Sequence, residues 1–145
     1  MKGEILAPCG DFACMEAAVR SGADAVYFGA GNFNARRNAN NFEGEAFAKA
    51  IAYCRVRGVK THITLNTLLH DDEIDRALAV ARSAAEAGAD ALIVQDLGLV
   101  RRIRHALPNR TCANQDRSRN LLPLIHTPSY DCREYRSHLL SGCHR

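Results

Sequence analysis

The chain has 145 residues, of which 47% are hydrophobic and 24% charged, and its formal net charge is +3 at pH 7. This size suits one domain, and the composition excludes a disordered chain because enough apolar side chains are present to form a core. No apolar run approaches the roughly 18 to 20 residues that cross a bilayer, and no signal-peptide pattern opens the chain. We therefore expect a cytoplasmic location.

The excess positive charge lies in the last part of the chain. Residues 1–107 contain 13 basic and 13 acidic side chains, whereas residues 108–145 contain 6 and 3. A charge-balanced body gives no electrostatic reason to expect non-specific nucleic-acid binding. The six cysteines include no Cys-x-x-Cys pair, so we expect free thiols, with no metal site and no cofactor held by this chain.

Strand and helix patterns alternate four times before Pro108. Short apolar runs predict strands at residues 4–7, 25–29, 59–65 and 91–95. Apolar side chains at helical spacing predict a helix after each strand, within residues 12–21, 47–57, 74–87 and 97–107. Helix-boundary residues support these limits, since Asp11 and Asp96 precede the first and last helices and Gly22 and Gly88 follow the first and third.

One helix-to-strand junction occurs twice. Residues 21–28 read Ser-Gly-Ala-Asp-Ala-Val-Tyr-Phe, and residues 87–94 read Ala-Gly-Ala-Asp-Ala-Leu-Ile-Val. Both copies combine a glycine that ends a helix, an aspartate turn and an apolar run, so the sequence predicts a repeated βα architecture.

The regular pattern ends near Pro108. From about Asn109 onward, polar residues, prolines and cysteines are mixed without a period, and no fifth strand–helix unit is predicted. A shifted reading frame or a truncated gene would produce such a change, and a genuine irregular tail is the alternative. We therefore divide the chain into a barrel-type domain, residues 1–108, and an irregular tail, residues 109–145.

The alternation of strands and helices predicts a parallel sheet with right-handed crossovers, and hence the α/β class. Four βα units within residues 1–107 scale to eight in a barrel of roughly 250 residues, so we expect a partial (β/α)8 barrel of the TIM type. A doubly wound nucleotide-binding domain is the alternative, but Asn34 stands where the third glycine of a phosphate loop after Gly29 and Gly31 would be. An incomplete barrel leaves strand edges unpaired, so we also expect self-association through those edges.

Both architectures place ligands at the carboxyl ends of the strands, where this sequence has polar side chains. In the Asn- and Arg-rich loop after the second strand, we expect Arg36 to bind a carboxylate or phosphate and Asn41 to hydrogen-bond a peptide or a base. Asn66 and Gln95 follow the third and fourth strands and are expected to contact the same ligand. For each residue the alternative is a structural role, as loop charge, turn residue or backbone partner.

No catalytic residue is assigned. Cys9 is the one thiol at a strand-to-helix turn, where a helix N-terminus could lower its pKa, but its pairing with His62 or His70 is unsupported and a packed thiol is the alternative. Asp11 and Asp96 are expected to cap helices rather than to form a catalytic carboxylate pair.

Six short motifs occur in order between residues 4 and 108. They are Leu-Ala-Pro-Cys-Gly-Asp at 6–11, Gly-Ala-Asp-Ala-Val-Tyr-Phe-Gly at 22–29, the Asn/Arg loop at 34–42, Gly-Val-Lys at 58–60, Thr-Leu-Asn-Thr-Leu at 64–68 and Val-Gln-Asp-Leu-Gly at 94–98. With these motifs at this spacing, the chain resembles the U32 peptidase family, also called the collagenase-like proteases.

The resemblance implies a barrel-like α/β fold and one of two activities. Some members are peptidases, including collagen-degrading ones. Others are accessory enzymes for hydroxylation of transfer RNA, ribosomal RNA or a quinone precursor, and hold an iron–sulfur cluster through cysteines in a later part of the family's chain. We therefore expect the N-terminal part of a U32-type peptidase, inactive alone, with a peptide or RNA substrate and no membrane partner. The alternatives are a hydroxylation enzyme without its cluster half, and a non-catalytic ligand-binding remnant.

Overall fold

The computed structural model describes residues 4–34, 42, 44–108, 111–115 and 121–124. These residues form six strands, four α-helices and one short 3-10 helix. In chain order the elements are β1 (Leu6–Pro8), α1 (Phe12–Arg20), β2 (Ala25–Gly29), α2 (Gly44–Val56), β3 (Lys60–Leu65), η1 (Asp71–Glu73), α3 (Ile74–Ala87), β4 (Ala91–Val94), α4 (Leu97–Ala106), β5 (Thr111–Gln115) and β6 (Leu121–Leu124).

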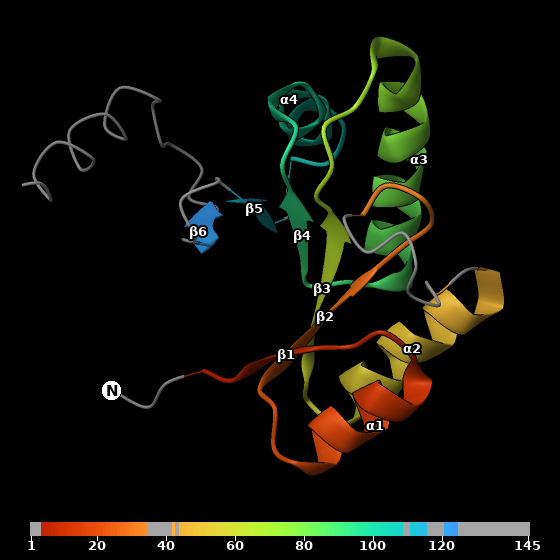
Figure 1. The fold of residues 1–145 in the computed structure, drawn as a ribbon, viewed down its shortest axis with the longest axis vertical. Coiled ribbons are helices and arrows are strands. Elements are labelled where there is room, and N and C mark those ends of the chain that lie inside the picture. The colour runs from red at the N-terminus through yellow and green to blue at the C-terminus, as the bar shows by residue number, and fades with distance from the viewer. Residues whose placement is uncertain (1–3, 35–41, 43, 109–110, 116–120, 125–145) are drawn as a thin grey trace, which may run out of the picture.

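The strands form one sheet in the order β1-β2-β3-β4-β5-β6, the same order as in the sequence (Figure 1). Strands β1 to β5 are mutually parallel, and β6 runs antiparallel to β5. The strand direction turns progressively from β1 to β4 in Figure 1, as the right-handed twist of strands requires. The α/β class and the four predicted βα units are therefore confirmed.

The sheet continues past the boundary at residue 108 that the sequence suggests. Strand β5 pairs with β4 in parallel register, with Ala91 opposite Thr111 and Val94 opposite Asn114. The segment 111–115 has no apolar run, so its composition does not predict a strand. The exposed backbone groups along the edge of β4 favour pairing whatever the side chains are, and this tertiary effect is invisible in the sequence pattern. The predicted irregularity of residues 125–145 lies outside the described residues.

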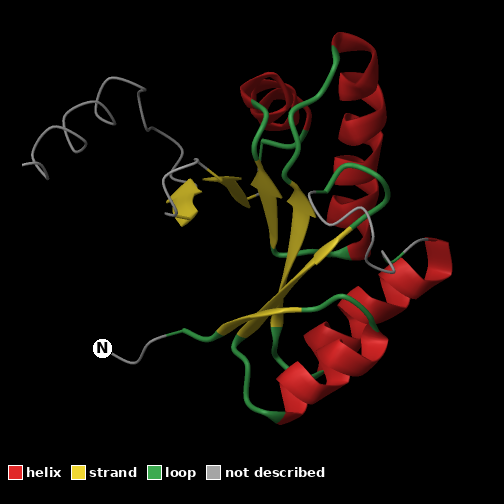
Figure 2. Cartoon of the chain, in the orientation of Figure 1, coloured by secondary structure: helices red, strands yellow, loops and turns green. Residues whose placement is uncertain are grey.

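The described residues form an apolar core between the sheet and the helices. Figure 2 shows the helices in red beside the yellow strands. Alternate strand residues enter this core and come from one face of the sheet, because side chains alternate along a strand. They are Val26 and Phe28 of β2, Ile63 and Leu65 of β3, and Leu92 and Val94 of β4. Each helix adds buried side chains to the same cluster, including Met15, Ile51, Ala81 and Ile103. All four helices therefore cover the same face.

The repeated Gly-Ala-Asp-Ala junction has the same geometry in both copies. Gly22 and Gly88 have φ values of 85° and 91°, in the left-handed region where a side chain is strained. The aspartate of each copy accepts a backbone N–H at the start of the neighbouring strand. The Ile5 N–H, just before β1, donates to Asp24 Oδ2 at 2.8 Å, and the Thr61 N–H of β3 donates to Asp90 Oδ2 at 2.8 Å. In both copies, the aspartate before one strand is thus hydrogen-bonded to the backbone at the start of the strand beside it.

Membrane-spanning helices are absent from the part of the chain that the structure describes, since none of its helices is long and apolar enough.

Candidate ligand-binding face

The loops after β1, β2, β3 and β4 all leave the sheet at its carboxyl edge, because these strands are parallel. Asn66 and Gln95 follow β3 and β4 directly, and both side chains are half-buried. The two strands are neighbours, with Leu65 opposite Val94, and the Gln95 N–H donates to Leu65 O at 3.5 Å. The fold therefore brings these two predicted site residues to adjacent positions.

The other two predicted site residues, Arg36 and Asn41, lie outside the described residues. The start of their loop is described. Asn34 is 2% exposed, and its Nδ2 donates to Gly31 O at 2.9 Å. This buried amide holds the turn after β2, where Gly31 has a φ of 59°. At least one asparagine of the Asn-rich loop therefore has a structural role.

Asp96 binds the start of α4 with one carboxylate oxygen and the loop after β3 with the other. Oδ1 accepts the Leu99 N–H at 2.9 Å, which is the N-cap of α4 predicted from the sequence. Oδ2 accepts the Leu69 N–H at 3.4 Å, from the loop after β3. The second contact is not apparent in the sequence, because Leu69 and Asp96 are 27 residues apart.

Asp11 and Cys9 have structural roles at the end of β1. Asp11 Oδ1 accepts the Cys14 N–H at 2.7 Å and caps α1, and this hydrogen bond holds the pKa of Asp11 below its usual value. Cys9 is 3% exposed, and burial raises the pKa of its thiol to about 11. A nucleophilic cysteine requires the opposite shift, so Cys9 is a packed thiol.

The two histidines considered with Cys9 lie at different levels of β3 and its loop. His70 is exposed just before η1. His62 lies in the first half of β3 opposite Tyr27 of β2, and burial lowers its pKa. The Cys9 thiol instead contacts Ala7 O at 3.9 Å.

The described cysteines do not suit a metal cluster. Cys9, Cys14 and Cys54 are free thiols, of which Cys9 and Cys54 are buried. Over the described ranges, no group of three or more His, Cys, Asp or Glu side chains lies close enough to hold a metal ion. An iron–sulfur cluster therefore has no fitting set of ligands among these residues.

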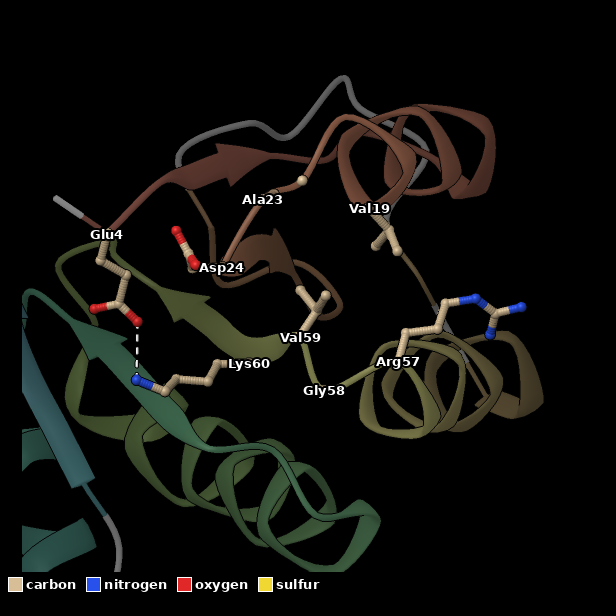
Figure 3. A pocket seen from close by; sticks show the side chains of 9 residues that line it. Glu4, Val19, Ala23, Asp24, Arg57, Gly58, Val59 and Lys60 are labelled. Carbon is tan, nitrogen blue, oxygen red and sulfur yellow. Dashed lines mark hydrogen bonds and ion pairs between the residues drawn. The ribbon is translucent and has the colours of Figure 1, made fainter. Parts of the chain in front are cut away.

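A pocket of about 680 Å³ lies at the opposite, amino edge of the sheet (Figure 3). Its charged residues do not converge: Lys60 Nζ pairs with Glu4 Oε1 at 2.8 Å, while Figure 3 shows Arg57 pointing away from them. Asp24, which also lines the pocket, is bound to the Ile5 N–H. Parallel α/β folds bind ligands at the carboxyl edge, so we regard this pocket as a feature of the structural end of the sheet.

The sequence patterns did not single out two exposed leucines on the carboxyl face. Leu68, in the loop after β3, is 65% exposed, and Leu97, the first residue of α4, is 69% exposed. Leu97 lies in the first turn of α4, and its side chain is not among the buried residues of that helix. The adjacent pair Leu68-Leu69 in a predicted loop was the one available signal.

These observations define an α/β protein with a sequentially ordered sheet, parallel from β1 to β5, one helical layer and polar loops at the carboxyl edge of the strands. The sequence profile of peptidase family U32 matches residues 10–115, well over half of the chain. The chain belongs to peptidase family U32. The match includes β5, in agreement with the continuation of the sheet beyond Pro108.

Curated relatives of two kinds are similar to this chain. The 23S rRNA 5-hydroxycytidine C2501 synthase of Escherichia coli is 42% identical over 97 residues, which are 67% of this chain and 15% of that protein. A collagenase of Porphyromonas gingivalis is 41% identical over 95 residues, 65% of this chain and 23% of the relative. The tRNA hydroxylation protein P1 of Bacillus subtilis is 32% identical over 108 residues, 74% of this chain and 26% of the relative. The chain thus spans about a quarter or less of the length of these relatives.

Proposed function

We propose that this chain supplies the substrate-binding face of a U32-type RNA hydroxylation protein and that it binds its substrate without cleaving it. The face consists of the loops at the carboxyl edge of the sheet, in a partial (β/α)8 barrel. Arg36, Asn41, Asn66 and Gln95 are the proposed contact residues.

The strand order supports a barrel over a doubly wound sheet. In a doubly wound fold the strand order reverses at a switch point and helices cover both faces. Here the order follows the sequence, and all four helices contribute to one core on one face. Successive right-handed βα units produce this arrangement in the wall of a (β/α)8 barrel.

We favour binding over hydrolysis because the candidate catalytic side chains already have structural roles. Asp11 and Asp96 accept backbone N–H groups as helix caps, and the Cys9 thiol is buried with a raised pKa. A hydrolase needs an activated nucleophile, a general base or a metal-bound water. These three residues have other roles, so the described part of the face is better suited to holding a ligand.

The proposed contact residues match the chemistry of RNA. Amide side chains such as Asn66 and Gln95 can donate to and accept from base edges. The guanidinium of Arg36 suits a phosphate, which it can bind through two parallel hydrogen bonds. An iron–sulfur cluster, if the whole protein uses one, would supply redox chemistry from residues other than those described here, and no step of binding depends on it.

A collagenase-like peptidase is the second candidate. It is favoured by the 41% identity to the Porphyromonas gingivalis collagenase. In that case the same amides would bind an extended peptide backbone, and the catalytic groups would lie elsewhere in the longer protein. The two candidates share a binding face and differ in the polymer that it binds.

Nucleoside mass spectrometry of RNA from cells lacking the gene tests the proposal. Loss of a hydroxylated nucleoside from transfer or ribosomal RNA, restored by the wild-type gene, is the expected result. Asn66→Ala and Arg36→Ala should restore it poorly, whereas Arg82→Ala, which removes an exposed charge on α3, should restore it fully. An unchanged nucleoside profile together with cleavage of gelatin by the purified protein would instead establish the peptidase.

We propose that the protein is located in the cytoplasm, where RNA modification takes place.

We also propose that the 145-residue chain alone self-associates, because β1 is an edge strand of the sheet. Size-exclusion chromatography with light scattering should show a dimer or larger species. A sharp monomer peak with cooperative unfolding would refute this.

A further inference from the structure

We propose that Asp96 is a positioning residue that joins two loops of the binding face into one subsite for an unpaired nucleobase. The subsite consists of the amides Asn66 and Gln95 and the exposed leucines Leu68 and Leu97. This inference rests on the proposed function for the identity of the ligand, whereas the joining of the two loops can be tested without it.

The first step of the inference is the geometry of the carboxylate. A helix N-cap needs one acceptor oxygen, and Asp96 Oδ1 fills that role by accepting the Leu99 N–H at 2.9 Å. Its second oxygen reaches the Leu69 N–H at 3.4 Å, in the loop that follows β3. Asp11, the corresponding cap of α1, contacts only the start of its own helix in the bonds that the structure gives its carboxylate. Asp96 therefore differs from Asp11 in that it also bonds the loop after the neighbouring strand.

The second step is the close packing around this carboxylate. A Cβ atom at Gly98 would lie 3.0 Å from Asp96 Oδ1 and 3.6 Å from Ile74 Cδ1. The first contact is tighter than ordinary van der Waals packing, so a side chain at Gly98 would push against the carboxylate. The absence of a side chain at Gly98 thus leaves room for the Asp96 carboxylate to make both hydrogen bonds.

The third step is what the two joined loops carry. Asn66 and Leu68 lie just before Leu69, and Gln95 and Leu97 flank Asp96. The leucines are 65% and 69% exposed, and each amide, half-buried, stands two residues before one of them in the sequence. An exposed aliphatic side chain next to an amide suits a ligand that has both an apolar face and a hydrogen-bonding edge. An unpaired nucleobase has both.

The substitution Asp96→Asn separates the two roles of the carboxylate. Asparagine is also a good N-cap, so its oxygen can keep the Leu99 contact, but its NH₂ group cannot accept the Leu69 N–H. Asp11→Asn is the matched control, because it makes the same change at a cap without the second loop. Hydrogen–deuterium exchange of the 145-residue chain should show faster exchange at Leu69 in Asp96→Asn and no change there in Asp11→Asn. Equal exchange at Leu69 in all three proteins would overturn the inference.

Binding of an unmodified tRNA transcript, followed by fluorescence anisotropy, tests the ligand. We expect Asp96→Asn to weaken binding about three- to tenfold, the size of effect that loss of one hydrogen bond produces. Leu97→Ser should weaken it to a similar extent, whereas Val56→Ser, at an 83% exposed position on α2, should bind as wild type does. Wild-type binding with no loss in Asp96→Asn or Leu97→Ser would refute the subsite and leave the proposed function standing. No binding by the wild-type chain would count against the proposed function and the nucleobase, while the exchange result would still decide the joining of the loops.

Discussion

The two edges of the parallel sheet use aspartate in different ways. At the amino edge, Asp24 accepts the N–H of Ile5, just before β1, and Asp90 accepts the N–H of Thr61 in β3. At the carboxyl edge, Asp11 and Asp96 each accept an N–H from the first turn of a helix. The first pair fastens strand to strand, and the second pair sets the start of the helix that follows.

This difference is one reason why we propose the carboxyl edge, rather than the amino edge, as the ligand-binding one. The amino edge is held by backbone contacts and by an exposed ion pair, and its pocket has no convergent charge. The carboxyl edge carries the half-buried amides Asn66 and Gln95 and the exposed leucines Leu68 and Leu97. The described pocket lies at the amino edge, and our proposal for the carboxyl edge depends on the side chains that follow the strands there.

Removing a strand-fastening carboxylate should have the largest effect on stability. Asp90→Ala leaves the Thr61 N–H and hydroxyl without their acceptor, and Thr61 is only 1% exposed, so we expect a loss of about 1 to 3 kcal/mol. Asp24→Ala frees the N–H of Ile5, which is 59% exposed, and should cost about 0.5 kcal/mol because water can replace the carboxylate. Urea denaturation of both variants gives the comparison, and equal losses would show that burial of the donor does not matter.

The glycines of the same two junctions give the next effect. Gly88→Ala should cost about 1 to 2 kcal/mol, because an alanine at a φ of 91° is strained. A Cβ there would also displace the Arg55 guanidinium, which donates to Ala87 O at 3.2 Å. Gly22→Ala has the same backbone strain at a φ of 85° and meets no atom within 4 Å. We therefore expect Gly88→Ala to have a slightly lower melting temperature than Gly22→Ala in thermal unfolding. The reverse order would contradict the role of the packing at Arg55.

His62, in the first half of β3, should make the free energy of unfolding depend on pH. Burial favours its neutral form and lowers its pKa, although Asp90 and Glu4 act in the opposite direction and Lys60 acts with burial. Because the folded pKa lies below the unfolded value of about 6.5, this contribution is complete above that pH and is lost as the pH falls toward the folded pKa. The free energy of unfolding should fall between pH 7 and pH 5 by at most about 1.4 kcal/mol per pH unit from this group. His62→Gln should reduce the slope, and an unchanged slope would exclude His62 as its source.

The Lys60–Glu4 ion pair should have the smallest effect. Its side chains are more than half exposed, and pairs of this kind are screened by water and salt. Hydrogen bonding to Glu4 raises the pKa of Lys60, so the pair stays charged at neutral pH. Lys60→Met should leave the urea midpoint unchanged within error. A marked loss that disappears in high salt would show that the amino edge depends on this pair.

Most of the fold could be predicted from local patterns. The apolar run at Ala25–Gly29 gives β2 with its observed limits, and Gly88 ends α3 as expected. These elements follow from side-chain period and backbone preference, which neighbouring residues determine together. The family was also evident from six ordered motifs and is confirmed by the match over residues 10–115.

The candidate site was predictable only in part. Asn66 and Gln95 were recognised because polar residues directly follow apolar strands, and the fold brings them together. Arg36 and Asn41 lie outside the described residues, and ligand contact remains a prediction for all four residues. The Asp96–Leu69 contact could not be anticipated, since it depends on the spacing of two loops that are distant in sequence.

The sequence by itself determined the class, the four βα units, the repeated junction and the family, because each depends on residues that are close together in the chain. The tertiary structure decided what backbone pairing and burial impose over distance. It added β5 to the edge of β4 and made Cys9 a packed thiol. It also gave Asp24 and Asp90 their partners, Ile5 just before β1 and Thr61 in β3, and brought the Leu69 N–H to Asp96.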